Sequence, residues 1–147
     1  MFYLIPISVM LFVDRITKLM VIAAADGRVG QLYEVFPFFN IVMVWNTGVS
    51  FSLFAGHGEW GRWILVVLAS AITAFLIRLM LQAKNRITGM AYAMVIAGAV
   101  GNIWDRIQYG AVADFLDFHL RGVHFPSFNV ADSLIFLGVV VLLFRKD

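Results

Sequence analysis

Four long apolar stretches constrain the fold of this chain more than any other feature. They run from about residue 2 to 25, 62 to 81, 87 to 106 and 129 to 144. An α-helix of about 20 apolar residues can cross a bilayer. Charged residues make up only 14% of the chain, against about a quarter of an ordinary soluble domain. We therefore predict an integral membrane protein, mainly α, in which residues 1–147 form a single membrane domain with four transmembrane helices.

The segment from 27 to 60 differs from these stretches. Turn residues alternate there with aromatic and β-branched residues, for example from Phe39 to Trp45, and no apolar run is long enough to cross a bilayer. This pattern favours short strands lying on the membrane surface between the first two spans. The first apolar run lacks a basic leader and a small-residue cleavage site, so we expect a retained span and not a signal peptide.

The basic residues predict the orientation of the spans. The short loop between the second and third stretches carries Lys84 and Arg86, and Arg145 and Lys146 follow the fourth stretch. Short basic loops mark the cytoplasmic side of a membrane protein. With four spans, both termini are then cytoplasmic, and the segments 27–60 and 107–128 are extracytoplasmic.

Two aspartates, Asp114 and Asp132, lie beside the spans near the predicted outer face. Because a charged side chain near the bilayer centre costs about 2.5–3.5 kcal/mol, such residues are functional candidates by default. Two carboxyl groups held close together cannot both ionise, so one keeps its proton while the other can accept one from water, as in aspartic proteases. Spacing alone leaves two alternatives open: Asp117 is the second carboxylate, or Asp132 only caps a helix.

Other polar residues fall at helical spacings. Asp14 and Lys18 lie four residues apart, so they can pair on one helical face. Asn102, Asp105 and Arg106 share a face near the outer end of the third stretch and can form one hydrogen-bonded cluster. A structural ion pair of Asp105, with Arg106 or with a neighbouring span, is an equal alternative.

Two glycine-containing motifs have structural as well as functional interpretations. Asn46-Thr47-Gly48 could hydrogen-bond the backbone of an extended ligand, but the same residues are common in turns. Gly98 and Gly101 are typical of close packing between membrane helices.

Several classes of function are excluded or disfavoured. The chain has no cysteine, which excludes thiol catalysis, disulfides and thiolate metal sites. His57, His119 and His124 lack the spacing to an acid that favours zinc, so we interpret them as interfacial side chains and expect no metal and no cofactor. The few basic residues are spread along the chain, so nucleic acid is not an expected partner.

Five ordered motifs resemble those of the bacterial lipoprotein signal peptidase family, signal peptidase II. The motifs are Asp14 with Lys18, Asn46-Thr47-Gly48, the run from Gly98 to Arg106, Val112-Ala113-Asp114-Phe115, and Phe128-Asn129-Val130-Ala131-Asp132. Each motif is weak alone, but their order and spacing match over nearly the whole chain. The only departure we note is Val49, where alanine is commoner in the family.

The resemblance implies an aspartic endopeptidase of the bacterial inner membrane, with its active site at the outer face. Such an enzyme removes signal peptides from diacylglyceryl-modified prolipoproteins by cutting before the lipidated cysteine. Asp114 and Asp132 would be the catalytic pair. Residues that would line or brace the substrate site are Asp14, Lys18, Asn46, Gly48, Asn102, Asp105, Arg106 and Asn129. The resemblance also implies a small extracytoplasmic β-cradle followed by a short lid helix between the first two spans, which agrees with the strands expected there. We expect a monomer whose partners are prolipoprotein substrates and membrane lipid.

Two other classes of function compete with this interpretation. A small proton- or ion-coupled carrier would use the carboxylates as a relay, but a relay needs groups at several depths, and here they cluster toward one leaflet. A non-enzymatic scaffold would use the polar residues to join helices. A scaffold would tolerate Asp114→Asn and Asp132→Asn, whereas a protease would not.

Overall fold

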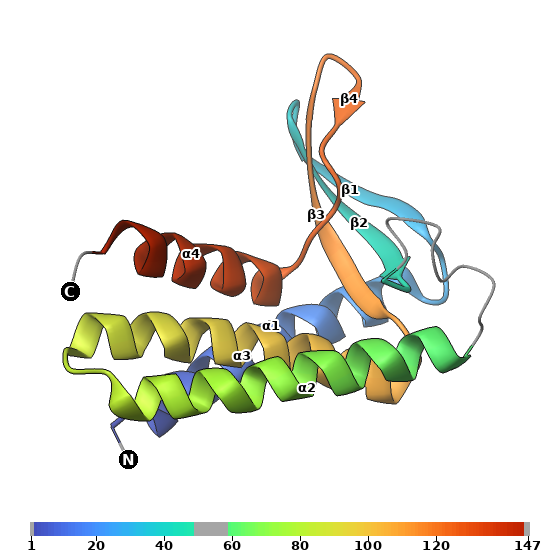
Figure 1. Cartoon of the computed structure of the whole chain (residues 1–147). Helices are drawn as coiled ribbons and strands as arrows, with labels where there is room; N and C mark the ends of the chain where they lie inside the picture. The colour runs from blue at the N-terminus through green and yellow to red at the C-terminus, as the bar shows by residue number, and fades with distance from the viewer. Residues whose placement is uncertain (1, 49–58, 146–147) are drawn as a thin grey trace.

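The computed structural model describes residues 2–48 and 59–145 and contains four long helices in that part of the chain. They are α1 (Leu4–Ala25), α2 (Glu59–Gln82), α3 (Arg86–Tyr109) and α4 (Val130–Phe144). All four predicted apolar stretches are therefore helical, and α3 continues three residues beyond its predicted end. The helices form a bundle in which α3 is central and packs against each of the others (Figure 1).

Length and apolar composition mark α2 and α3 as helices able to cross a membrane. Of the other two, α4 is apolar but has 15 residues, and α1 carries Asp14, Arg15 and Lys18 in its middle. Large apolar side chains on the outside of the bundle, such as Phe75 and Leu81 on α2, are exposed. A surface of this kind suits lipid and not water.

Small residues allow α3 and α4 to pack closely. A side-chain carbon added at Gly98 would collide with the backbone carbonyl of Ala131, and one added at Gly138 would collide with that of Ala91. One added at Gly101 would press on the carboxylate of Asp14 in α1. The close-packing interpretation of Gly98 and Gly101 is therefore confirmed, and this close approach brings polar side chains of three helices together.

A four-stranded antiparallel sheet stands at one end of the bundle (Figure 1). Its strands are β1 (Gly30–Phe36), β2 (Phe39–Asn46), β3 (Val112–Leu120) and β4 (Val123–His124), paired in that order. The prediction of strands after the first helix is confirmed for β1 and β2. The predicted lid helix and Val49 lie outside the described residues.

The sheet also extends beyond the segment between the first two helices, where the strands were predicted. The segment between α3 and α4 supplies β3, which pairs with β2 from Asn46 opposite Val112 to Phe39 opposite Phe118. Because β2 would otherwise present unpaired backbone groups along one edge, a partner strand from elsewhere in the chain is required there. This pairing places Asp114, the third residue of β3, directly opposite Val44.

Candidate active site

The first turn of α4 is closed by a reciprocal capping box. Asn129 Oδ1 accepts a hydrogen bond from the backbone N–H of Asp132 (2.9 Å), and Asp132 Oδ2 accepts one from the backbone N–H of Asn129 (3.2 Å). Asp132 therefore does cap the helix, as one alternative proposed. The same Asn129 side chain is fully buried and donates through Nδ2 to Asp114 Oδ1 (2.7 Å). A single asparagine thus binds both aspartates.

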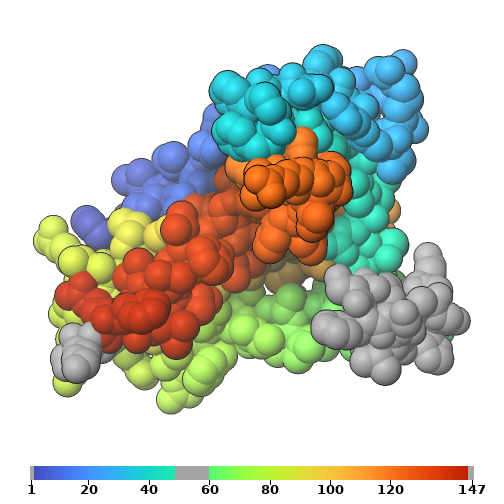
Figure 2. Space-filling view, turned by 90° about the horizontal axis from the view of Figure 1, so that it is seen from above, coloured from blue at the N-terminus to red at the C-terminus, as the bar shows by residue number. Residues whose placement is uncertain are grey.

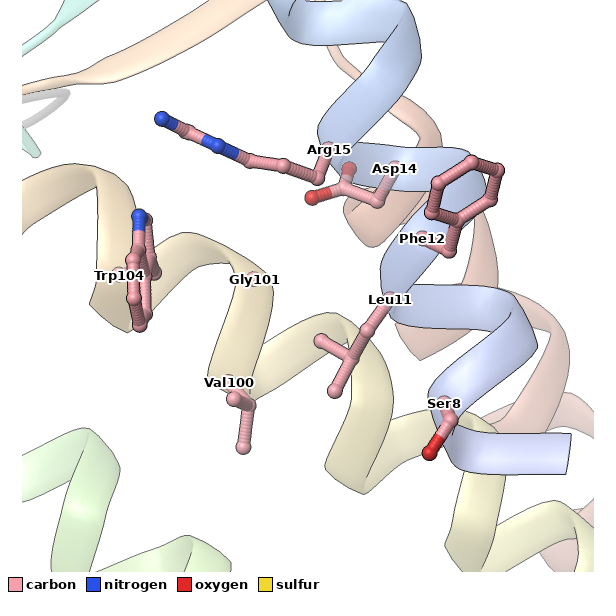
Figure 3. A pocket seen from close by; sticks show the side chains of 8 residues that line it. All are labelled: Ser8, Leu11, Phe12, Asp14, Arg15, Val100, Gly101 and Trp104. Atoms are coloured by element: carbon pink, nitrogen blue, oxygen red, sulfur yellow. The ribbon is translucent and has the colours of Figure 1, made fainter. Parts of the chain in front are cut away.

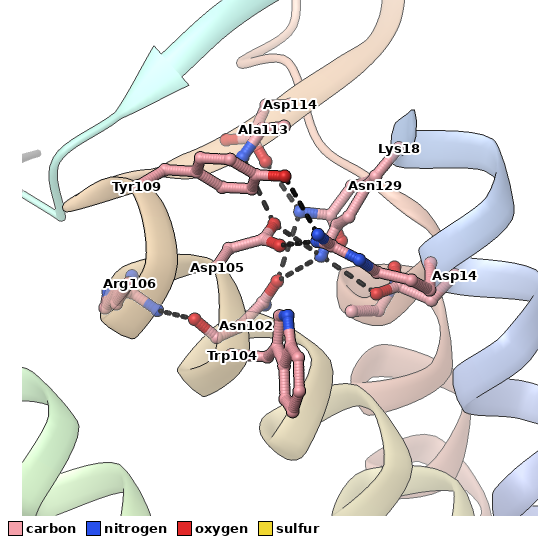
Figure 4. Close-up of polar contacts among 12 residues, drawn as sticks. Asp14, Lys18, Asn102, Trp104, Asp105, Arg106, Tyr109, Ala113, Asp114 and Asn129 are labelled. Carbon is pink, nitrogen blue, oxygen red and sulfur yellow. Dashed lines mark hydrogen bonds and ion pairs between the residues drawn. The ribbon is translucent and has the colours of Figure 1, made fainter. Parts of the chain in front are cut away.

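Two more amides complete the connection between the carboxylates. Asn102 of α3 donates through Nδ2 to Asp132 Oδ1 (2.7 Å), and its Oδ1 accepts from Asn129 Nδ2 (3.2 Å). Asn46, at the end of β2, donates through Nδ2 to Asp114 Oδ2 (2.8 Å). Figure 4 shows the part of this network around Asp114, Asn102 and Asn129. Residues from four distant segments thus meet at one carboxylate pair.

The two carboxyl groups have different surroundings. Asp114 is buried, with 2% of its surface exposed, whereas Asp132 is only partly buried. Burial raises the pKa of Asp114 to about 6, and the charge of Asp132 acts in the same direction. Hydrogen bonds from Asn46 and Asn129 and the charge of Lys18 limit this rise in pKa. Asp114 therefore holds a proton at higher pH than an ordinary aspartate does.

Behind the pair lies a buried ion cluster centred on Lys18. The Lys18 ammonium is fully buried and contacts Asp14 Oδ2 (2.9 Å), Asp105 Oδ2 (3.0 Å) and Asn102 Oδ1 (3.1 Å). The predicted pairing of Asp14 with Lys18 is present. Asp14 also accepts the backbone N–H of Ala131 in the first turn of α4 (2.8 Å). The cluster joins α1 and α3 to the helix that carries Asp132.

Asp105 and Arg106 do not form the ion pair with each other that was one alternative from the sequence. Asp105 pairs across helices with Lys18 and with Arg15 (3.0 Å) and not with Arg106. Arg106 donates to the backbone carbonyl of Asn102 (3.3 Å), and its charge interacts with those of Asp132, Asp114 and Asp105.

Arg15 is a residue that sequence reasoning did not single out. Besides Asp105, its guanidinium contacts Gln108 Oε1 (3.2 Å) and Tyr109 Oη (2.8 Å). Arg15 also lines a groove of about 470 Å³ between α1 and α3, together with Trp104 (Figure 3). Its position beside Asp14 in a helix was the only signal in the sequence.

Asn46-Thr47-Gly48 is a turn that also orients a site residue. The backbone N–H of Gly48 donates to Asn46 Oδ1 (2.8 Å), which leaves the Asn46 amide nitrogen directed at Asp114. Gly48 has φ of 83°, and a side chain there would collide with Leu65 of α2. The glycine is therefore needed both for backbone conformation and for space.

Asp117 does not join the carboxylate pair. Both of its oxygens accept from His124 Nδ1 (2.9 Å each), and Oδ2 also accepts from Asn40 Nδ2 (3.0 Å). Burial acts to raise the pKa of Asp117, but these hydrogen bonds and the two nearby histidines outweigh it, so the pKa lies below its ordinary value. Within the described segments, no three acidic or histidine side chains are grouped to hold a metal ion.

An apolar groove of about 460 Å³ opens beside the pair. Its lining residues are Phe125, Phe128, Asp132, Ser133, Phe136 and Leu137. Asp132 is the only carboxylate among these lining residues. A bound apolar chain in this groove would therefore pass next to Asp132.

Comparison with known proteins identifies related chains over almost the full length. The sequence profile of a family described as signal peptidase (SPase) II matches residues 6–146. The lipoprotein signal peptidase of Aeromonas hydrophila subsp. hydrophila is 43% identical, over 96% of this chain and 87% of that protein. That of Azoarcus sp. (strain BH72) is 40% identical, over 98% and 81%. A bacterial membrane enzyme solved by the in meso method superposes with a TM-score of 0.83 at 28% identity, over 99% of this chain and 94% of the other.

Proposed function

Since this chain belongs to the signal peptidase II family, we propose that Asp114 and Asp132 are the catalytic pair with which it cleaves prolipoproteins. The family is one of aspartic endopeptidases that act as lipoprotein signal peptidases, and the chain shares that activity. The observation that carries the assignment is the Asn129 side chain, which holds Asp114 through Nδ2 and caps Asp132 through Oδ1. Asp117 is engaged by His124 and Asn40 instead.

Because the two carboxyl groups have different surroundings, they have different roles in proton transfer. Asp132, beside the groove, accepts a proton from the water whose oxygen attacks the scissile carbonyl carbon. Buried Asp114 gives its proton to the amide nitrogen as the carbon–nitrogen bond breaks, so the products are a new carboxyl terminus and a new amine. The pair ends with its proton on Asp132, and proton transfer between the two resets it. Asn46, Asn102 and Asn129 hold the carboxylates in position for these steps.

The apolar groove beside Asp132 is the proposed binding site for the apolar parts of the substrate. Phe125, Phe128, Phe136 and Leu137 give it an apolar lining next to Asp132. The substrate is a prolipoprotein whose cysteine carries diacylglycerol, and its apolar parts are retained by burial while the scissile bond reaches the pair. Cleavage occurs before the lipidated cysteine.

The whole chain is proposed to act as one monomeric domain of the bacterial inner membrane, with all four helices as spans. The N-terminal end of α1, the C-terminal end of α4 and the basic turn between α2 and α3 lie at one end of the bundle, and the sheet lies at the other (Figure 1). Basic short loops favour the cytoplasm. The termini are accordingly cytoplasmic, and the carboxylate pair works at the outer face.

The test of this function is cleavage of a purified prolipoprotein by the purified chain in detergent, with and without diacylglycerol on the cysteine. Mass spectrometry of both products locates the cut. We expect cleavage of the lipidated substrate alone, directly before the modified cysteine. Equal cleavage of both substrates would contradict the lipid requirement, and no cleavage of either would contradict the function.

The rate of cleavage is expected to fall as pH rises through the pKa of Asp114. Burial and the charge of Asp132 raise this pKa to about 6, and above it the acid of the pair loses its proton. In Asn46→Leu a hydrogen bond that lowers the pKa is lost, so the alkaline limb of kcat/KM should move to higher pH. The same raised pKa means that Asp114 stabilises the fold in acid and that this contribution is lost as pH rises through about 6. A pH-independent rate would contradict the role of Asp114 as acid.

A further inference from the structure

The contact between Asp117 and His124, here called the hairpin clasp, lies outside the carboxylate pair. Asp117 is a buried carboxylate in β3, with 4% of its surface exposed, while the His124 side chain is about half exposed. Asn40 of β2 holds Asp117 from one side, and His124 holds it from the other (2.9 Å). Without His124, this buried carboxylate keeps only Asn40 as a side-chain donor among the described residues.

The clasp lies beside an irregularity in the sheet. After β4, the returning segment runs along β3: Phe125 N–H donates to the carbonyl of Phe118 (2.8 Å), and Phe128 pairs with Leu116 (2.8 and 3.1 Å). Between these contacts, β3 has one residue, Asp117, and the returning segment has two, Pro126 and Ser127. This is a bulge, which redirects the strand that carries the extra residue. In Figure 2 the hairpin formed by β3 and β4, coloured orange, lies between the β1–β2 strands and α4.

The bulge determines where the next side chain points. Asn129 follows Phe128 directly, and its amide must face Asp114 to make its 2.7 Å hydrogen bond. A slip of one residue in strand pairing turns each side chain to the opposite face. Pro126 has no backbone N–H with which to fix the register at the bulge. The last side-chain anchor before the bulge is His124 on Asp117.

We propose that His124 and Asp117 are positioning residues of this peptidase, which set the register of the returning segment so that Asn129 and Asp132 meet Asp114. This inference rests on the proposed catalytic pair. The clasp acts through the Asn129 amide and touches neither substrate nor the reacting atoms.

The proposal predicts a change in the acid–base behaviour of the pair. Asp114 interacts with Asp132 of α4, Lys18 of α1 and Arg106 of α3, and it accepts hydrogen bonds from Asn46 and Asn129. Of these groups, the clasp positions Asn129 and Asp132. The Asn129 hydrogen bond lowers the pKa of Asp114, whereas the charge of Asp132 raises it, so displacing these two groups shifts the alkaline limb of the rate away from its wild-type pH.

The experiment compares His124→Ala with His124→Asn, whose amide nitrogen can replace the ring Nδ1 as a donor. In the folded full-length enzyme, His124→Ala should lower kcat by about tenfold or more, with KM little changed and the alkaline limb shifted from its wild-type pH. Hydrogen exchange in residues 125–129 should become faster. His124→Asn should recover most of kcat and the original pH limb. The matched control is Val123→Ala, a neighbouring and largely exposed position, which should behave as wild type.

Two results would overturn the proposal. One is a His124→Ala enzyme with wild-type kcat, pH profile and hydrogen exchange. The other is an equal loss in His124→Ala and His124→Asn, which would assign the effect to ring packing. Hydrogen exchange reports the strand register of residues 125–129 and does not depend on catalysis. It therefore tests the clasp independently of the proposed function. If wild type fails to cut prolipoprotein but His124→Ala still loosens residues 125–129, the catalytic assignment fails and the clasp remains.

Discussion

Asp114→Asn and Asp132→Asn are each expected to slow cleavage of diacylglyceryl-modified prolipoprotein by roughly a hundred- to ten-thousandfold, the contribution of a positioned acid or base. An amide at either place cannot exchange the proton that the reaction moves. At Asp114 the new amide group would also place a donor against Asn46 or Asn129, both of which donate to this residue. Initial rates measured with saturating substrate give the loss in kcat.

Controls for this prediction must separate chemistry from folding. Asp26→Asn is the matched substitution, because Asp26 is exposed at the end of α1 with φ of 46°, a conformation that asparagine tolerates well. It should leave the rate unchanged. Asp132→Asn also weakens the capping box, at a cost of about 1 kcal/mol, so the unfolding of each variant is measured beside its rate. A folded variant that retains wild-type activity would show that its carboxylate takes no part in the reaction.

Lys18→Met is expected to destabilise the protein by about 3–5 kcal/mol, the usual cost of removing one partner from a buried ion pair. The ammonium has no exposed surface and contacts Asp14 (2.9 Å) and Asp105 (3.0 Å). Methionine has a similar length but no charge, so Asp105 would keep only Arg15 as a cation in direct contact, and Asp14 would keep none among the described residues. The free energy of unfolding in detergent measures the effect.

The same substitution at an exposed lysine gives the control. Lys84 lies exposed in the turn between α2 and α3, and Lys84→Met should change the free energy of unfolding by less than about 0.5 kcal/mol. Adding Asp14→Asn to Lys18→Met removes one of the stranded charges and should restore part of the stability. Equal stability of the Lys18 and Lys84 variants would contradict the structural importance of the buried cluster.

The sequence predicts the helices well because their signal is local. A long apolar run is visible in any window along the chain, and α2 and α4 begin or end within a few residues of the predicted limits. The strand β3 has no such signal, since its partner β2 lies far earlier in the chain and the pairing depends on how the helices pack. For that reason the sheet was predicted from one segment when two segments build it.

The candidate site shows the same limit. Motif resemblance assigned the residues around Asp114 and Asp132, but not their partners. Arg15 and Asp105 are separated by 90 residues, and only the packing of α1 against α3 brings them together. The contact of His124 with Asp117 is short in sequence, but it depends on a hairpin that was not predicted. Neighbours in space that are distant in sequence, or joined by an unforeseen turn, cannot be derived from spacing.

The capping box at Asn129 has a consequence for how this enzyme can move. Local fraying is normally least costly at a helix end, but here the first turn of α4 and the carboxylate pair share the same hydrogen bonds. If that turn opened, Asn129 would no longer hold Asp114 and Asp132 close together, so the carboxylates keep their positions only while the turn is closed. The first turn of α4 is therefore expected to stay closed while the substrate enters, so that it serves as a rigid support for both carboxylates.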